Sequence, residues 1–484
     1  MKFYEIIKNY KVDIIQSKET TIKHLSIDSR DIKENTMFFC IEGLTFDGHN
    51  YIDKVVKKGS NTIVVSKNLK FYPKDIAVVK VDNVREFMVH CASNFNNNSH
   101  QNVKMIGVTG TNGKTSIVHF LKSVLEKNSI ITGSIGTVGF KVGDEIIDKS
   151  VKTSSSPDTI DLHEIINIMV KKGATHIAME VTSHALALNK CYGINFEVGI
   201  FTNLTQDHLD FHKTMENYCD EKVKLMKKSN VSIINVDDKY ANKFIENAKN
   251  KVVTYSIKND SDFKASNIIF ENNSITYNLK FNENIYNVYV PIPGEFTVYN
   301  TLATIAALVN LGLNIESIIN TFKNISGVLG RMQRVENDKN KTIIIDYAHT
   351  PDALENVIKS TKNFSKGKVI TVFGCGGNRD KTKRSTMGKI SGQLSDFTIV
   401  TSDNPRNEDP KSIVLEIENG IKQVTKNYNV LVNRFDAIKK AIEIANEQDV
   451  VIIAGKGHEN YQEICGVKHH FDDYEVAKEI LESL

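Results

Sequence analysis

The sequence predicts an α/β protein of three domains. Its 484 residues are too many for a single hydrophobic core, and the length suggests roughly three domains. Short apolar runs typical of buried strands alternate with amphipathic helical segments over most of the chain. This alternation predicts parallel sheets flanked by helices. With 40% hydrophobic and 25% charged residues, the composition is that of an ordinary water-soluble protein.

The first predicted domain, residues 1–100, is a small α/β domain. Short β-branched runs at 62–65 and 76–79 are typical of strands. The stretch 94–102 is rich in asparagine, and Phe95 is its only large apolar residue. We therefore interpret this stretch as a linker and place the domain boundary there.

The second predicted domain, residues 101–329, has a parallel sheet covered by helices on both faces. It opens with an apolar run at 103–108, and further strands separated by helical segments are expected at 177–180, 198–201 and 231–234. From 251 to 290 apolar and polar residues alternate, which predicts a β-rich addition to this domain.

The third predicted domain, residues 330–484, repeats the α/β rhythm and is expected to be Rossmann-like. Its strands are predicted at 342–345, 369–372, 397–400 and 450–453. A final helix carries Val476, Ile480 and Leu484 on one face. Most of these strands end in a polar, glycine- or aspartate-bearing loop, and open α/β sheets bind their ligands at that edge.

Charge and cysteine usage exclude several classes of protein. Lysine and arginine total 61 against 58 acidic residues, so a nucleic-acid partner recognised through bulk charge is not expected. The six cysteines are scattered without paired metal-ligand spacing, which indicates reduced thiols in the cytoplasm. No signal-peptide pattern is present, and no apolar run approaches the ~18 residues of a membrane span. We expect a cytoplasmic enzyme or nucleotide switch without a membrane partner.

The segment 107–115 is the most informative stretch of the chain. A glycine-rich turn between a predicted strand and helix ends in Gly113, Lys114 and Thr115. Such a turn presents backbone N–H groups and a helix N-terminus to a phosphate chain. Lys114 would reach the outer phosphates, and the Thr115 hydroxyl would hold Mg²⁺. The usual P-loop glycine is Val108 here, with Gly110 supplying the early flexibility. A tight turn without a ligand explains this pattern less well than binding of a nucleotide triphosphate.

Two further segments carry candidate metal ligands at predicted strand ends. Glu180 ends a strand, and a carboxylate beside a phosphate loop suits Mg²⁺, which prefers oxygen donors. The alternative is a strand-end glutamate in solvent. Four ionisable side chains lie between Asp207 and His212, with His208 the favoured imidazole ligand to a second Mg²⁺. The alternative there is a solvated loop.

Six motifs occur in the order found in the Mur ligase family, at 107–115, 180–186, 202–212, 294–300, 330–332 and 346–351. The match spans essentially the whole chain and most resembles the E-type branch, which adds the third residue of the peptidoglycan stem peptide. The resemblance implies an ATP-dependent, ADP-forming ligase of peptidoglycan synthesis, and hence of cell-wall biogenesis, cell shape and cell division. It would add meso-diaminopimelate to UDP-N-acetylmuramoyl-L-alanyl-D-glutamate through an acyl phosphate.

The resemblance also implies roles around ATP. The nucleotide-binding set would be Gly110, Thr111, Asn112, Gly113, Lys114, Thr115, Asn300, Arg331 and Asp346, the last three around adenine and ribose. Lys222, four residues after Tyr218, would carry CO₂ as a carbamate and join Thr115, Glu180 and His208 around Mg²⁺. From the residues alone, Lys222 is instead predicted to be an exposed helical lysine. Lys114, His208 and Lys222 would be the catalytic residues.

The acceptor nucleotide would bind to the first domain and to part of the second. The motifs 28–30 and 47–49 resemble the family's uridine-nucleotide site, and the implied acceptor residues are Ser29, Ser155, Ser156, Thr182 and Lys190. Several positions depart from the family pattern, among them Leu329 in place of a proline, and two of them change a polar side chain. Leu188 replaces a glutamine, and Lys190 replaces an arginine and so loses its guanidinium fork. A differently bound or different acceptor therefore stays open.

The third domain would select the incoming amino acid. Its implied binding residues are Arg379, Asp403, Asn404, Pro405, Arg406, Gly455 and Glu459. Arg379 and Arg406 can clamp a carboxylate, while Asp403 and Glu459 can take an ammonium group. In the E-type branch, the 403–406 motif is associated with meso-diaminopimelate rather than lysine, which has no distal carboxylate.

Three alternatives stay open beside this prediction. The first is the same ligation with L-lysine or another diamino acid. The second is a folylpolyglutamate-synthase-like ligase, against which the extra N-terminal domain and the 403–406 loop argue. The third is a nucleotide-binding regulator without ligase activity, which would not need Glu180, His208, Lys222 and Arg406 together. For the ligase we expect small-molecule substrates, ATP, Mg²⁺ and a monomeric protein.

Overall fold

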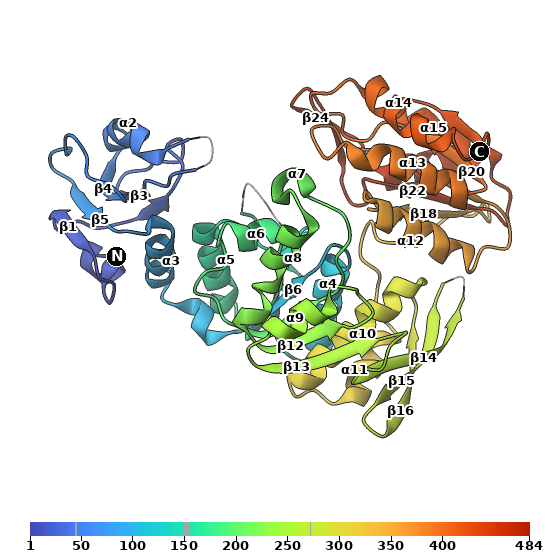
Figure 1. Ribbon diagram of the computed structural model, residues 1–484, viewed down its shortest axis with the longest axis horizontal. Helices are drawn as coiled ribbons and strands as arrows, with labels where there is room; N and C mark the ends of the chain where they lie inside the picture. The colour runs from blue at the N-terminus through green and yellow to red at the C-terminus, as the bar shows by residue number, and fades with distance from the viewer. Residues whose placement is uncertain (44–45, 150, 152–154, 272) are drawn as a thin grey trace. The chain divides into compact units, whose positions relative to one another are not determined.

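The computed structural model describes residues 1–43, 46–149, 151, 155–271 and 273–484. The chain forms two compact units. Figure 1 labels many of the helices and strands. The first unit comprises Met1–Gly107 and Ser129–Glu197, and the second comprises Val108–Asn128 and Val198–Leu484. The chain first passes from one unit to the other within strand β6 (Lys104–Thr109).

The N-terminal part of the first unit is a small sheet with strand order β1-β5-β4-β3-β2. Its strands are β1 (Asp13–Gln16), β2 (His24–Ser26), β3 (Thr36–Phe39), β4 (Ser60–Val65) and β5 (Ala77–Lys80). β1 pairs antiparallel with β5, and the other neighbours are parallel. Alternate strand residues face opposite sides. Phe39 and Val64 pack with α1 (Phe3–Ile7) and α3 (Val84–Phe95). Phe38 and Ile63 pack with α2 (Ile52–Lys57).

The stretch interpreted as a linker is instead part of this folded unit. Asn94 and Phe95 belong to α3, and Ser99–Asn102 forms a 3₁₀-helix, η2. The Asn94 side chain is buried and donates a hydrogen bond to the Ile6 carbonyl at 2.8 Å. The prediction was wrong because these asparagines use their amides to satisfy backbone carbonyls inside the fold, so a polar composition did not mean an exposed segment.

The rest of the first unit contains one end of an 11-stranded sheet, with neighbouring strands in the order β6-β10-β7-β8-β9. Besides β6, its strands are β7 (Thr132–Gly136), β8 (Gly139–Val142), β9 (Glu145–Ile146) and β10 (His176–Glu180). β10 pairs parallel with β7, whereas β7, β8 and β9 pair antiparallel. Helices α5 (Thr159–Lys171) and α6 (Ser183–Ala187) complete the unit.

The second unit begins with the strand order β16-β15-β14-β13-β12-β11-β6. These strands are β11 (Phe196–Phe201), β12 (Ser229–Asn235), β13 (Lys251–Ser256), β14 (Phe263–Phe270), β15 (Ile275–Phe281) and β16 (Asn284–Val290). β12, β13 and β14 are parallel neighbours, and β14, β15 and β16 are antiparallel. The antiparallel strands β14, β15 and β16 account for most of the alternating pattern between 251 and 290.

Helices of this region include α4, which begins directly after the glycine-rich loop, and α10, which packs against it. The helices are α4 (Lys114–Lys127), α7 (Leu209–His212), α8 (Met215–Val223), α9 (Ala241–Asn247), α10 (Glu295–Asn310) and α11 (Ile315–Phe322), with the 3₁₀-helix η3 (Met226–Lys228). α10 is buried nearly all round, because it also contacts β12, β13 and β14. It brings Asn300 towards the loop that precedes α4.

The C-terminal part of the second unit is a sheet with strand order β17-β18-β22-β19-β20-β21. Its strands are β17 (Gln333–Arg334), β18 (Thr342–Asp346), β19 (Val369–Phe373), β20 (Phe397–Val400), β21 (Tyr428–Val430) and β22 (Val450–Ala454). All neighbours are parallel except β17 with β18. A hairpin of β23 (Tyr461–Ile464) and β24 (Val467–His470) follows.

Helices cover both faces of this C-terminal sheet. One face packs on α12 (Pro351–Lys362), α13 (Thr382–Leu394) and α14 (Pro410–Ile421). The other packs on α15 (Arg434–Ile444) and α16 (Asp473–Ser483). Loops that carry the predicted amino-acid-binding residues follow the carboxyl ends of β19, β20 and β22. Across the residues that the structure describes, no helix has both the length and the apolarity needed to cross a membrane.

Candidate functional site

The loop before α4 has a backbone that requires glycine at two positions. Gly110 and Gly113 have φ angles of 149° and 90°, in the region that favours glycine. A Cβ atom on Gly113 would lie 2.7 Å from Asn300 Oδ1, and one on Gly110 would overlap the Thr202 hydroxyl at 1.8 Å. The loop therefore packs tightly on its neighbours and leads directly into the N-terminus of α4, where backbone N–H groups lack helical partners.

Two residues after β11 hold this loop in place. The backbone N–H of Thr111 donates to the Asn203 carbonyl at 2.8 Å, and that of Asn112 donates to Asn203 Oδ1 at 2.9 Å. The Thr202 hydroxyl donates to the Asn112 carbonyl at 2.6 Å. Thr202 and Asn203 were part of a recognised motif, but their contacts to a loop 90 positions away could not be read from the sequence.

Lysines 114 and 222 converge on the same carbonyl of the loop. Lys114 Nζ donates to the carbonyls of Gly110 and Thr111 at 2.9 and 2.7 Å, and Lys222 Nζ donates to the Gly110 carbonyl at 2.7 Å. Lys222 is 1% exposed and lies 4.8 Å from the centre of the Tyr218 ring. The expectation of an exposed helical lysine was wrong, because α8 turns the face with Tyr218, Cys219 and Lys222 inward.

Burial makes the Lys222 amine a weak base. Removal from water, reinforced by the positive charge of Lys114, holds the pKa of Lys222 well below its usual value. The amine is therefore uncharged over a wider pH range than that of a surface lysine. An uncharged amine is a nucleophile, whereas an ammonium group is not.

His208 lies at the start of α7 in a left-handed conformation, with a φ of 54°. Its side chain is 43% exposed, and its Nε2 lies 3.3 Å from Asp207 Oδ2. Burial alone would raise the pKa of Asp207, but the nearby His208, His349 and Lys383 lower it overall. This loop thus meets groups from the C-terminal part of the second unit. Lys383 on α13 was not predicted, since nothing in its local sequence distinguishes it from a surface lysine.

Asn300, Arg331 and Asp346 also belong to the second unit. Arg331 stacks over Tyr347 at 4.4 Å from the ring centre, and its Nη2 donates to Thr115 Oγ1 at 3.4 Å. Both carboxylate oxygens of Asp346 accept backbone N–H groups, from Met332 at 2.8 Å and Ala348 at 2.9 Å. The structure thus brings Arg331 to the first turn of α4. Asp346 meanwhile fixes the turn that carries Arg331.

The loops after β20 and β22 meet through their polar side chains. Asn404 Nδ2 donates to Glu459 Oε2 at 2.7 Å. A Cβ atom on Gly455, whose φ is 116°, would lie 2.5 Å from Asp403 Oδ2. Burial, and then the neighbouring Asp403, raise the pKa of Glu459. Lys456 Nζ lies 3.7 Å from Glu459, and burial lowers the pKa of this lysine. The buried Asp403, Asn404 and Lys456 and the partly buried Glu459 therefore form one polar cluster.

The two predicted arginines of this region differ. Arg406 is held, because its Nη1 donates to the Gly377 carbonyl at 2.8 Å and its Nε lies 3.4 Å from a Glu463 carboxylate oxygen. Pro405, the preceding residue, is buried. Arg379 is exposed, and its Nη1 reaches the Asn378 carbonyl at 3.5 Å. The role of Glu463 was missed, because it lies in a hairpin outside the recognised motifs.

The remaining predicted residues belong to the first unit. Glu180 is 1% exposed, so the alternative of a solvent-exposed glutamate was wrong. Its Oε1 accepts the Thr137 backbone N–H at 2.7 Å, and its Oε2 accepts the Thr137 hydroxyl at 3.1 Å. Ser156 lies beside it, because its hydroxyl donates to the Glu180 carbonyl at 3.1 Å and accepts the Thr182 backbone N–H at 3.2 Å. Thr182 in turn caps α6.

The other acceptor candidates lie on three different segments. Ser155 precedes Ser156 and is half-buried. Lys190 Nζ lies 3.9 Å from Asp158 Oδ2, near the start of α5. Ser29 lies on another loop, after β2, and its carbonyl accepts a hydrogen bond from Lys58 at 3.2 Å.

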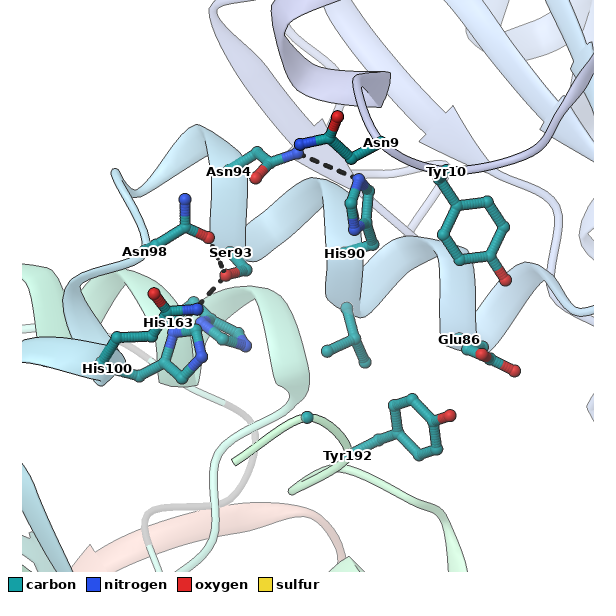
Figure 2. Close-up of a pocket in the computed structure, with 13 residues that line it drawn as sticks. Asn9, Tyr10, Glu86, His90, Ser93, Asn94, Asn98, His100, His163 and Tyr192 are labelled. Atoms are coloured by element: carbon teal, nitrogen blue, oxygen red, sulfur yellow. Dashed lines mark hydrogen bonds between the residues drawn. The ribbon is translucent and has the colours of Figure 1, made fainter. Parts of the chain in front are cut away.

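A separate cavity of about 400 Å³ lies in the first unit between α3, η2 and α5 (Figure 2). Its described lining residues include none of the predicted site residues. His100 and His163 meet edge to face there, with ring centres 5.0 Å apart. Burial lowers the pKa of His163 to about 3.

Three family models match the chain along its length. They are "Mur ligase family, catalytic domain" over 21–96, "Mur ligase middle domain" over 108–308 and "Mur ligase, glutamate ligase domain" over 330–457. The chain is 45% identical to a UDP-N-acetylmuramoyl-L-alanyl-D-glutamate–2,6-diaminopimelate ligase of Clostridioides difficile, and 44% identical to such a ligase of Clostridium acetobutylicum. Both alignments cover 100% of each chain.

A solved structure of a UDP-N-acetylmuramoyl-L-alanyl-D-glutamate–2,6-diaminopimelate ligase is similar along the whole chain. It has a TM-score of 0.71 and 29% identity, covering 100% of this chain and 99% of that one. The predicted three-domain α/β architecture is thereby confirmed. The chain belongs to the Mur ligase family.

Proposed function

We propose that this protein is an ATP-dependent, ADP-forming ligase that adds 2,6-diaminopimelate to UDP-N-acetylmuramoyl-L-alanyl-D-glutamate in peptidoglycan synthesis. One observation carries the proposal. The same unit combines a glycine-rich loop, to whose Gly110 carbonyl two lysines donate, with a polar cluster of Asp403, Asn404 and Glu459. The first feature suits a triphosphate and the second an ammonium group. The relatives that match over their full length carry the name of this activity.

The chemistry proceeds in two steps. The D-glutamyl γ-carboxylate of the acceptor attacks the γ-phosphate of ATP, forms an acyl phosphate and releases ADP. The uncharged amine of diaminopimelate then attacks the acyl carbon, and phosphate leaves with the electron pair of the broken C–O bond. Lys114 offsets negative charge on the phosphates, and the loop N–H groups hold them in line with the carboxylate. Gly110, Thr111, Asn112, Gly113 and Thr115 complete this phosphate site.

We assign Mg²⁺ to Thr115, Glu180, His208 and Lys222. The donors fit the ion, because Glu180 offers a buried carboxylate and Thr115 a hydroxyl in the first turn of α4. When bound, Mg²⁺ neutralises phosphate charge. Lys222 becomes a suitable ligand once its uncharged amine adds CO₂, giving a carbamate and a released proton. The burial and lowered pKa of Lys222 support this modification.

The amine site is assigned to the C-terminal loops. Asp403 and Glu459 take one ammonium group, Arg406 takes a distal carboxylate, and Asn404, Pro405 and Gly455 shape the site. Arg379 lies exposed on a neighbouring loop and is assigned to the carboxylate by resemblance. Asn300, Arg331 and Asp346 are assigned to the adenosine of ATP. The acceptor is assigned to Ser29, Ser155, Ser156, Thr182 and Lys190.

We further infer domains with the predicted boundaries 1–100, 101–329 and 330–484, a monomeric enzyme and a cytoplasmic location. The family models at 21–96, 108–308 and 330–457 support the boundaries.

The test is ADP release from ATP with UDP-N-acetylmuramoyl-L-alanyl-D-glutamate and one amine at a time: meso-diaminopimelate, L-lysine or L-ornithine. We expect the kcat/KM for meso-diaminopimelate to be at least about a hundredfold above that for lysine. Lysine has no distal carboxylate, so the ion pair assigned to Arg406 cannot form with it. Turnover with lysine alone would replace the amine assignment. Turnover with folate and glutamate instead would favour the folylpolyglutamate-synthase-like alternative.

A further inference from the structure

The loops after β20 and β22 are joined beneath the candidate amine site by a buried ion pair. Arg434, the first residue of α15, and Asp473, the first residue of α16, both have side chains that are 0% exposed. The contact is bidentate: Arg434 Nε and Nη2 each donate to one Asp473 oxygen at 2.7 Å. Such a fork fixes the plane of the guanidinium group.

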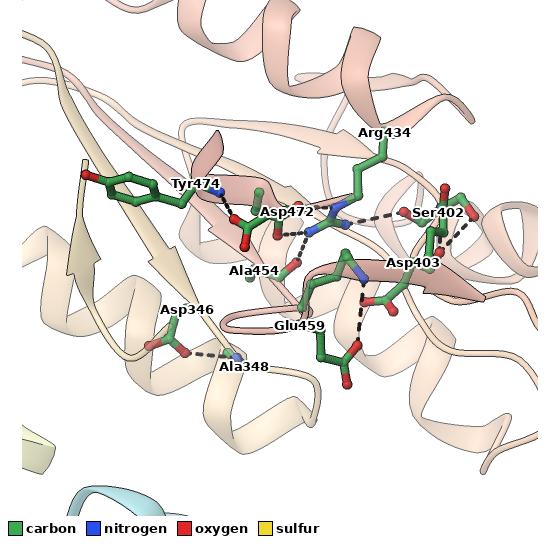
Figure 3. Close-up of polar contacts among 12 residues, drawn as sticks. Asp346, Ala348, Ser402, Asp403, Arg434, Ala454, Glu459, Asp472 and Tyr474 are labelled. Atoms are coloured by element: carbon green, nitrogen blue, oxygen red, sulfur yellow. Dashed lines mark hydrogen bonds and ion pairs between the residues drawn. The ribbon is translucent and has the colours of Figure 1, made fainter. Parts of the chain in front are cut away.

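The remaining donors of Arg434 reach the two loops (Figure 3). Nη2 donates to the Ala454 carbonyl at 2.9 Å, and Nη1 donates to the Ser402 carbonyl at 3.3 Å. Each carbonyl immediately precedes a residue of the proposed amine site, Gly455 and Asp403. β19 lies between β20 and β22 in the sheet, so one guanidinium group spans the ends of two strands that are not neighbours.

The charge of Arg434 also interacts with the two carboxylates of the proposed amine site. Burial alone would lower the pKa of Arg434, but Asp473, followed by Asp403 and Glu459, raise it overall. A buried ion pair adds little to stability compared with well-packed apolar side chains, so its stability alone gives no reason for a guanidinium here. A planar group with five donors is, however, well suited to hold two carbonyls at a fixed spacing.

We propose that Arg434, held by Asp473, is a positioning residue that sets the spacing of the 403–406 and 455–459 loops and thereby the affinity for the incoming diamino acid. The proposal rests on the proposed function for its substrate, but its structural part does not. Lysine at position 434 keeps the charge yet cannot donate to both carbonyls while also pairing with Asp473 through two bonds.

The first test compares Arg434→Lys with wild type in steady-state kinetics, varying each substrate in turn. We expect the KM for meso-diaminopimelate to rise at least about tenfold, with the KM for ATP within about twofold and kcat changed less than about threefold. The matched control is Lys341→Met. Lys341 holds the other end of α15 through the Ile442 and Ala445 carbonyls at 2.7 and 2.6 Å, so its loss loosens the same helix without touching either loop.

The second test is hydrogen–deuterium exchange of the same three proteins without substrates. We expect amides of 403–406 and 455–459 to exchange at least about tenfold faster in Arg434→Lys, but not in Lys341→Met. If Arg434→Lys does not fold, Asp473→Asn, which keeps the shape and removes one half of the pair, is measured with the same expectation. Unchanged loop exchange, or equal KM shifts in the variant and the control, would overturn the proposal. Absence of wild-type turnover with any diamino acid would instead overturn the proposed function, and the exchange experiment would still decide the structural part.

Discussion

Lys222 lies in an unusual environment for a lysine. Lysines are rarely fully buried without a carboxylate partner, yet Lys222 is 1% exposed and bonded to a backbone carbonyl. A group whose pKa is lowered by burial reduces the stability of the fold, a cost that proteins accept where the group serves a reaction. The same observation thus links the packing of α8 to the proposed carbamate.

Replacement of this amine by an isosteric apolar side chain should stabilise the unmodified protein. The folded-state pKa of Lys222 lies below the unfolded value of about 10.4. Between these two pKa values the unfolded chain binds more protons than the folded one, so the penalty is present at pH 7 and fades as the pH approaches 10. In CO₂-free buffer, Lys222→Met should raise the melting temperature at pH 7, by ~2–4 °C for each kcal/mol relieved. Ligase activity should be lost.

The control for this measurement is Lys224→Met, whose amine pairs with Glu221 at 2.6 Å and is 39% exposed. The melting temperature of Lys224→Met should stay close to that of wild type at pH 7. A Lys222→Met protein that melts below wild type at pH 7 would show instead that the lysine stabilises the fold as a charged group.

Gly113 is the second residue whose role can be isolated by substitution. Alanine at a φ of 90° costs about 1–2 kcal/mol in the backbone, and its Cβ would also press on Asn300 Oδ1. We expect Gly113→Ala to raise the KM for ATP roughly tenfold, because ~1.4 kcal/mol corresponds to a factor of ten. Gly312, with a φ of 96° and no atom within 4 Å of its Cβ position, is the matched control. Gly312→Ala should lose similar stability and leave the KM for ATP unchanged, and equal KM effects would refute a role specific to the loop.

At the scale of elements, α8 shows how a short helix places one buried lysine. It begins at Met215 after Thr214, whose hydroxyl accepts the Asn217 backbone N–H at 3.1 Å. Its inward face then carries Tyr218 and Lys222, one turn apart. The cap fixes where the helix starts and therefore which side chains face the phosphate loop.

Loss of this cap should weaken the helix and the modification of Lys222 together. Thr214→Ala removes an acceptor worth about 1 kcal/mol at a helix N-terminus, whereas Thr214→Ser keeps it. We expect faster hydrogen exchange of the α8 amides in Thr214→Ala, and a weaker carbamate signal in ¹³C NMR with ¹³C-bicarbonate. Thr214→Ser should match wild type in both measurements. If α8 exchanged faster but the carbamate signal stayed intact, the modification of Lys222 would not depend on this cap, and the prediction would be contradicted.

At the scale of the whole molecule, the sequence predicted the α/β class and the strands that end at the sites. The runs at 342–345, 369–372, 397–400 and 450–453 all lie within observed strands, because buried parallel strands are continuously apolar. The segment 94–102 failed as a linker, because side-chain amides can replace water inside a fold. Local composition does not record such pairing.

The site was predictable where local motifs carry the chemistry and not where tertiary contacts do. The loop 107–115 could be read directly, since its glycines and lysine are adjacent in the chain. Arg434 and Asp473 are 39 positions apart, and each looks like a helix-start residue on a surface. The burial of Lys222 likewise depends on how α8 packs, which periodicity over nine residues does not fix.

The central claim is that the enzyme activates a carboxylate as an acyl phosphate and passes it to an amine. The most direct measurement supplies UDP-N-acetylmuramoyl-L-alanyl-D-glutamate labelled with ¹⁸O in the D-glutamyl γ-carboxylate, together with ATP and meso-diaminopimelate. We expect one ¹⁸O atom in each released phosphate, with ADP and the ligated product formed in equal amounts. Product formed with AMP, or with unlabelled phosphate, would contradict this claim.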